Sequence, residues 1–164
     1  MPTQQELKEL LHYDPDTGVF TWKAAVGKRI KIGRTTGTPN GKGYLRVKIK
    51  GRLYLAHRLA WLYVYGVWPK WPEVQIDHIN NVRSDNRIEN LRVSTHRQNS
   101  QNRKKVLGCT CKLKGASKRL GRFRAHITID NKKVSLGSYD TEEEAHAAYK
   151  AAAEKEFGAF ARAE

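Results

Sequence analysis

An acidic residue and a histidine stand side by side in the middle of the chain, at Asp77 and His78. Hydrolysis of a phosphodiester needs a group that takes a proton from water near neutral pH, and histidine is suited to that task. The reaction also needs a divalent cation that stabilises charge on the phosphate, and a carboxylate is a suitable ligand for Mg²⁺ or Mn²⁺. Because neighbours in a strand point to opposite faces, a bend is required to aim both side chains at one phosphate.

Asparagines follow this pair at spaced positions. Asn90 lies in the stretch DNRIENLR, and Asn99 lies in residues 94–102, which predict a helix capped by Ser94 or Thr95. Asparagines are common in turns, and that explanation is sufficient for those of the loop, Asn86 and Asn90 included. It does not explain the spaced set of Asp77, His78 and Asn99.

Residues 76–102, IDHINNVRSDNRIENLRVSTHRQNSQN, resemble the HNH endonucleases in the form found in phage-type homing endonucleases. That family folds this unit as two strands and a helix around one metal ion. The resemblance implies that His78 is the general base and that Asn90 braces the loop and orients that base. It also implies that Asp77 and Asn99 hold the metal, with asparagine in the third position of the motif. Two oxygen ligands with waters and a phosphate favour Mg²⁺ or Mn²⁺ over Zn²⁺.

The resemblance extends upstream through GYLRVKIKGRLYLAHRLAW, which is similar to the family's leading hairpin and helix. The alternation in residues 44–49 and 53–56 predicts that hairpin, and residues 57–65 have helical spacing. His57 stands at the start of this helix. We interpret it first as a structural histidine with satisfied hydrogen bonds, and second as a residue adjacent to the catalytic site.

The charge of the chain indicates a polyanionic partner. Lys and Arg number 31 against 16 Asp and Glu, a formal net charge of +15, and neutralising phosphates releases condensed counterions. No apolar run approaches the roughly 18 residues of a membrane span. The N-terminus lacks the plan of a signal peptide, so we expect an intracellular protein. Cys109 and Cys111 are expected to be reduced and partly buried.

The pattern changes near residue 105. Strands are expected at about 108–113, 122–129 and 132–137, followed by the helix TEEEAHAAYKAAAEKEFG, in which Thr141 and Glu144 form a capping box. Alternation directs one set of side chains toward this helix, Phe123, Ala125, Ile127 and Ile129. It directs the other set away from the helix, Arg122, Arg124, His126 and Thr128.

Residues 108–160 resemble the DNA-binding domain of the plant Apetala and ethylene-response transcription factors, mainly through GRFRAHITIDNKKVSLGSYDTEEEAHAAYKAAAEKEFGAFA. In that family a three-stranded sheet lies in the major groove and a helix supports it from behind. The resemblance implies a DNA-binding face made of Thr110, Lys112, Arg122, Arg124, His126, Thr128 and Ser135. Several of these differ from the residues usual in the plant family, so the resemblance supports phosphate contacts better than base readout.

Together these patterns predict an α+β protein with three parts. Residues 1–43 are an N-terminal helix, expected over residues 3–12 with Thr3 and Glu6 as a capping box, and a basic loop region. Residues 44–104 are an HNH nuclease domain of the ββα-metal type, and residues 105–164 an Apetala-like domain with a three-stranded antiparallel sheet packed on one helix. The predicted function is a metal-dependent endonuclease that acts on double-stranded DNA as a monomer. The alternatives are a DNA-binding regulator with an inactive nuclease half and, ranked last, a basic RNA-associated protein.

Overall fold

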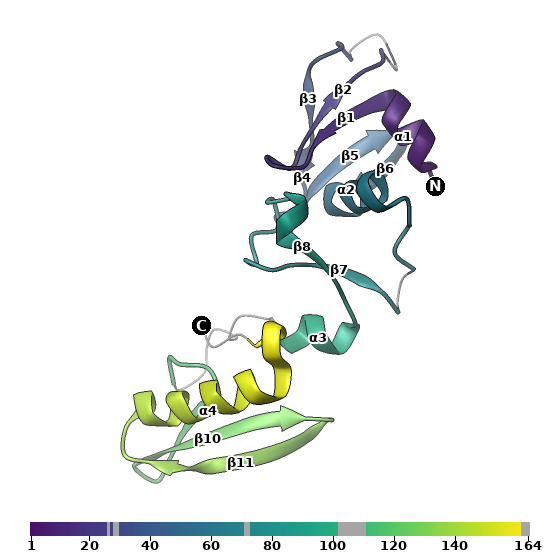
Figure 1. Ribbon diagram of the computed structural model, residues 1–164. Helices are drawn as coiled ribbons and strands as arrows, with labels where there is room; N and C mark the ends of the chain where they lie inside the picture. The colour runs from purple at the N-terminus through teal and green to yellow at the C-terminus, as the bar shows by residue number, and fades with distance from the viewer. Residues whose placement is uncertain (26, 28–29, 71–72, 102–110, 162–164) are drawn as a thin grey trace. The chain divides into compact units, whose positions relative to one another are not determined.

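The computed structural model describes residues 1–25, 27, 30–70, 73–101 and 111–161. They form two compact units, Met1–His96 and Arg97–Glu164 (Figure 1). Both units combine helices with small antiparallel sheets, so the α+β class is confirmed. The sequence predicted divisions between residues 43 and 44 and between residues 104 and 105, whereas the two units of the structure meet between His96 and Arg97. Within the described residues, no helix has the length and apolar character needed to span a membrane.

The first unit begins with helix α1, Gln4–Leu10, which has the predicted capping box. The Thr3 hydroxyl accepts from the backbone N–H of Glu6 at 3.1 Å, and the Glu6 carboxylate accepts from the N–H of Thr3 at 2.9 Å. The helix was expected to reach residue 12 but ends at Leu10. Leu11 instead starts strand β1, Leu11–Asp14, where it stays buried in the same core as Leu7.

Two three-stranded sheets and one helix build most of this unit. β1 pairs with β2, Val19–Trp22, and β2 with β3, Thr35–Thr36. The second sheet joins β4, Thr38–Pro39, to β5, Leu45–Ile49, and β6, Arg52–Leu55, which leads into helix α2, Ala56–Tyr65. Gly66 ends α2 in the left-handed conformation. One core joins these elements, so residues before and after position 43 fold together; it includes Leu7, Leu11, Phe20, Val47 and Leu59.

The motif region forms a strand pair followed by a helix. β7, Gln75–His78, runs antiparallel to β8, Leu91–Ser94, with the short 3₁₀ helix η1, Ile88–Asn90, immediately before β8. Helix α3, His96–Gln101, comes next in the chain. The order strand, strand, helix matches the prediction, but the division between the two units falls at the start of α3.

The second unit is a sheet covered by a helix (Figure 1). β9, Ala116–Arg119, β10, Arg122–Ile129, and β11, Lys132–Tyr139, are antiparallel with β10 in the centre. Helix α4, Glu142–Phe157, packs on one face and continues into η2, Gly158–Phe160. Ala125 and Ile127 are buried under it, as alternation predicted, together with Ala145, Tyr149 and Ala153.

The first strand of this sheet was predicted at the wrong place. Residues 108–110, including Thr110, lie outside the described residues, and residues 111–113 form a bend. The backbone N–H of Leu113 donates to the Glu142 carboxylate at the start of α4, which takes it away from a strand ladder. Gly115 then turns the chain with a φ of +83°, at a point where a Cβ would meet the Tyr149 ring at 2.1 Å. Lys112 therefore lies in this bend, exposed, and not on a strand.

Candidate functional site

Strand β7 carries Asp77 and His78 in a regular ladder, opposite Arg92 and Leu91 of β8. All four residues of β7 are buried, with Asp77 7% and His78 4% exposed. Neighbours in a strand ordinarily point to opposite faces. The two side chains accordingly contact different partners, Arg92 in one case and a group of rings and an amide in the other. The bend expected between Asp77 and His78 is therefore not seen in the pairing of β7 with β8.

His78 is surrounded by two other rings and one amide. Its ring stands at 83° to that of His57, with centroids 5.0 Å apart, and Tyr44 lies 5.9 Å away. The Oδ1 atom of Asn86 lies 3.4 Å from Nε2 of His78. Burial lowers the pKa of His78 below its ordinary value of 6.5, against the opposing effects of Asn86 and Asp77. The imidazole is therefore neutral near pH 7, which is the form that accepts a proton.

Asn90 joins the two ends of the loop that separates β7 from β8. Its Oδ1 accepts from the backbone N–H of Asn80 at 3.0 Å, and its Nδ2 donates to the carbonyl of Asp85 at 2.9 Å. Inside the loop, Arg87 donates to both oxygens of Asp85, at 2.9 and 2.8 Å, which lowers the pKa of Asp85 to about 2. These are the contacts of a residue that braces a loop.

Asp77 holds a cationic side chain across the strand pair. Nη2 and Nε of Arg92 lie 3.0 and 3.1 Å from Oδ2 of Asp77. A buried carboxylate that already attracts a cation has the donor chemistry that Mg²⁺ or Mn²⁺ prefers. In the described part of the chain, no three His, Cys, Asp or Glu side chains gather into a metal-binding group. A metal ion bound by Asp77 would therefore need further oxygen ligands from amide groups or water. The amide ligand predicted from the sequence is that of Asn99.

Asn99 lies in α3 and belongs to the second unit. Its side chain is partly buried. Its place beside Asp77 stays a prediction, as does its role as a metal ligand.

His57 lies in the first turn of helix α2, and its ring packs against the ring of His78. The residue is 5% exposed. The expectation of a histidine with satisfied hydrogen bonds is wrong for one of its nitrogens, because Nδ1 is buried and has no hydrogen-bond partner among the described residues. Burial, followed by the charges of His78 and Arg58, lowers the pKa of His57 to about 3. His57 is therefore a neutral ring beside His78.

This shift predicts a loss of stability in acid. The unfolded state binds a proton on His57 below about pH 6.5, whereas the folded state does so only near pH 3. Stability therefore falls as the pH drops through this window, by about 2 kcal/mol between pH 7 and 5 from this residue alone. All four tryptophans precede residue 97, so their fluorescence in urea reports on the first unit. His57→Phe should flatten the pH dependence, and His12→Ala, at an exposed histidine, should not. Equal slopes in His57→Phe and the native chain would contradict the prediction.

Three residues near His78 were missed as site residues. Asn86 was interpreted as a turn former, yet it is 1% exposed and touches the imidazole. Tyr44 packs on both histidines, and the guanidinium of Arg83 lies 5.1 Å from the centre of its ring. The contacts of Tyr44 join segments far apart in the chain, so local spacing carries no signal for them. For Asn86, complete burial is the observation that separates it from an ordinary turn residue.

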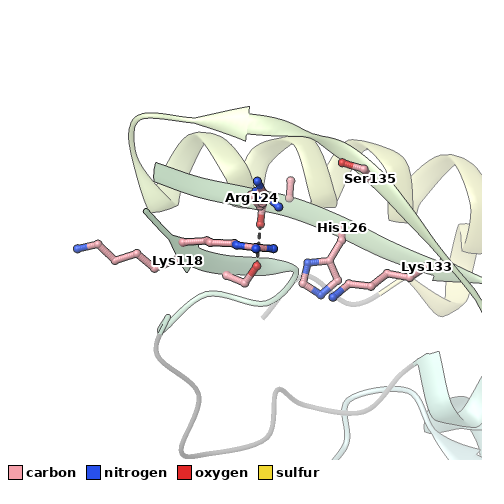
Figure 2. Close-up of a pocket in the computed structure, with 8 residues that line it drawn as sticks. Lys118, Arg124, His126, Lys133 and Ser135 are labelled. Atoms are coloured by element: carbon pink, nitrogen blue, oxygen red, sulfur yellow. Dashed lines mark hydrogen bonds between the residues drawn. The ribbon is translucent and has the colours of Figure 1, made fainter. Parts of the chain in front are cut away.

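The second unit presents a basic face on the side of its sheet away from α4. Cross-strand pairs place Arg124 opposite Ser117, Thr128 opposite Lys133, and His126 opposite Ser135. A pocket of about 410 Å³ lies on this face (Figure 2), lined by Ser117, Lys118, Arg119, Arg124, Ala125, His126, Lys133 and Ser135. The described residues that line it include four cations and no carboxylate. Of the predicted DNA-binding residues, the five on β10 and β11 lie on this face: Arg122, Arg124, His126, Thr128 and Ser135.

Arg122 and Arg119 are direct cross-strand partners. Like charges in that position repel each other. Asp140 offsets part of this repulsion through an ion pair with Arg122 at 3.0 Å. Arg124 and Lys133 line the pocket itself, so a face with this arrangement favours an anionic partner.

Comparison with protein families supports a nuclease. Residues 54–101 match the family of HNH endonucleases. The matched segment contains α2, β7, β8 and α3, and with them Asp77, His78, Asn90 and Asn99. This match supports a hydrolase-type enzyme with a DNA substrate, and HNH nucleases generally use a divalent metal ion. Among curated proteins no match was found.

Proposed function

We propose that this chain is a metal-dependent endonuclease that hydrolyses phosphodiester bonds of double-stranded DNA. The observation that carries the proposal is a buried, neutral His78 on a strand pair within the segment that matches the HNH endonucleases. His78 acts as the general base and takes a proton from the attacking water. Asn90 keeps the loop after β7 closed through its bonds to Asn80 and Asp85, which holds the strand that carries the base.

Asp77 and Asn99 are the proposed ligands of one divalent ion. Such an ion supplies Lewis-acid stabilisation of the negative charge that develops on the phosphate and the leaving oxygen. Carboxylate and amide oxygens favour Mg²⁺ or Mn²⁺ over Zn²⁺. Arg92 shares the Asp77 carboxylate, and this guanidinium keeps the buried charge of Asp77 compensated.

The second unit is proposed to hold the DNA through the basic face of its sheet, in the manner of the Apetala-like domains that its sequence resembles. Arg122, Arg124, His126, Thr128 and Ser135 belong to this face, and Lys112 and Thr110 are proposed to extend it. The absence of carboxylates among the described pocket residues supports contacts with phosphates, which position a protein on DNA. A monomer with one metal site would cut one strand at a time. We propose an intracellular homing-type or phage nuclease.

A plasmid assay tests the proposal against the alternative of a DNA-binding regulator with an inactive nuclease half. Supercoiled DNA is incubated with the protein in EDTA, Mg²⁺, Mn²⁺ or Zn²⁺. We expect nicked circles with Mg²⁺ or Mn²⁺, and uncut DNA in EDTA because the charge on the leaving oxygen is then not stabilised. A gel shift run in parallel reports binding. Protein that shifts the plasmid but leaves it uncut with every ion would establish the regulator instead.

A further inference from the structure

We infer that Asn86 is the positioning residue that sets the tautomer of His78, so that Nε2 carries the proton and Nδ1 carries the lone pair. The inference about the tautomer stands on hydrogen-bond chemistry. Its consequence, that Nδ1 is the atom that accepts a proton from water, rests on the proposed nuclease function. No feature of the sequence motif assigned this task to Asn86, which was interpreted as a turn former.

The orientation of the Asn86 amide follows from its second partner. Its Nδ2 donates to the backbone carbonyl of Ser84 at 3.1 Å. A carbonyl can only accept, so the nitrogen of the amide must face Ser84 and the oxygen must face His78. That oxygen lies 3.4 Å from Nε2. An amide oxygen cannot donate, so this contact is a hydrogen bond only when Nε2 carries the proton.

The tautomer then follows for the neutral ring. A neutral imidazole has one N–H and one lone pair, so a proton on Nε2 leaves the lone pair on Nδ1. At 3.4 Å the contact is longer than an ordinary N–H···O hydrogen bond, but Asn86 is 1% exposed and His78 4% exposed. With so little access to water, the opposite tautomer would set two acceptors against each other, and leaving buried polar groups unsatisfied is unfavourable.

The N-terminal hairpin holds Asn86 in place. The hydroxyl of Tyr13 donates to the backbone carbonyl of Asn86 at 2.7 Å. Gly18, in the turn between β1 and β2, has a φ of +72°, and a Cβ there would lie 2.5 Å from the Asn86 carbonyl carbon and the Arg87 nitrogen. The turn thus closes directly on the segment that carries the amide. This gives residues 1–43, unexplained by the sequence motifs, a part in positioning the base.

Nitrogen-15 NMR of histidine-labelled protein measures the tautomer directly and does not depend on activity. The chain has six histidines, and the spectrum of His78→Gln identifies the signal of residue 78. Above the pKa of His78 we expect a protonated Nε2 and an unprotonated Nδ1 in the native chain. A protonated Nδ1 would overturn the inference, whether or not the protein cuts DNA. Conversely, a protein that never cuts DNA but shows the expected tautomer would sink only the nuclease proposal.

Two substitutions then separate Asn86 from a merely structural residue. Asn86→Leu removes the acceptor at similar volume, whereas Asn86→Asp keeps it. We expect Asn86→Leu to yield mixed tautomers and to lower kcat by about 10- to 100-fold, by analogy with the loss seen when the hydrogen-bond partner of a metal-ligating histidine is removed, with KM within about twofold. Asn86→Asp should retain the Nε2–H tautomer.

Tryptophan fluorescence at increasing temperature checks that both variants are folded. An unchanged tautomer in folded Asn86→Leu would overturn the role of Asn86. If Asn86→Leu does not fold, the native spectrum and that of Asn86→Asp decide: Nε2–H in both supports the inference, and Nδ1–H in either contradicts it.

Discussion

Replacing His78 by alanine is expected to lower the rate of plasmid cleavage by about 10²- to 10⁴-fold, the range that a general base ordinarily contributes. The substitution removes the proton acceptor and leaves the proposed metal ligand Asp77 and the basic face of the second unit in place. DNA binding, measured by gel shift, should therefore stay close to that of the native chain. The measurement is the initial rate of nicking at saturating Mg²⁺ or Mn²⁺, with protein in excess over DNA.

His12→Ala is the matched control, because it removes an exposed histidine of the same unit that lies on β1. Its cleavage rate should equal that of the native chain. His78→Gln serves as a second variant that keeps more of the buried volume, and its fluorescence melting shows whether the first unit is folded. A folded His78→Gln protein that nicks DNA at the native rate would show that another group accepts the proton.

The elements predicted well are those whose causes are local. The capping boxes of α1 and α4 lie within four consecutive residues each, and the alternation of β10 directs Ala125 and Ile127 to the core without reference to the rest of the chain. The hairpin of β5 and β6 is similarly encoded by alternation on both sides of a glycine turn.

The elements predicted poorly depend on distant partners. β9 pairs with β10 through a turn in which Leu120 has a φ of +50°, a conformation that a leucine rarely adopts and that no turn motif signals. The displaced segment before it is drawn to Glu142, at the N-terminal end of α4. Contacts between residues far apart in the chain determine where these elements lie. No short stretch of the sequence carries a signal for such contacts.

The same distinction applies to the site. Asp77, His78 and Asn90 were proposed as site residues from their types, their spacing and the family resemblance, and the side chain of Asn90 bonds across the loop between β7 and β8. The surroundings of His78 are not recognisable in this way. His57 comes from α2 and Tyr44 precedes β5, and the carbonyl of Asn86 is held by Tyr13, 73 positions earlier. The proposed catalytic residues belong to a local motif, whereas several of the groups around His78 come from distant parts of the chain and are found only after it has folded.

Removing two positive charges from the basic face of the second unit is expected to weaken DNA binding and to flatten its salt dependence. Arg124 and Lys133 are the residues of choice because both line the pocket, whereas Arg122 is already paired with Asp140. Each phosphate contact contributes about 0.9 to the slope of log K against log salt. Arg124→Ala with Lys133→Ala should therefore reduce the magnitude of that slope by about 2.

The matched control removes the same charge from the opposite side of the same unit. Lys150 and Lys155 are exposed on α4, and α4 covers the other face of the sheet. Both double variants are made in the His78→Ala background, so that DNA stays intact during a titration from low to high salt. If both double variants show the same loss of DNA affinity and the same reduction in the slope of log K against log salt, binding depends on net charge alone. A loss confined to Arg124 and Lys133 would instead establish that this face contacts phosphates, because the two pairs carry the same charge on opposite faces of one unit.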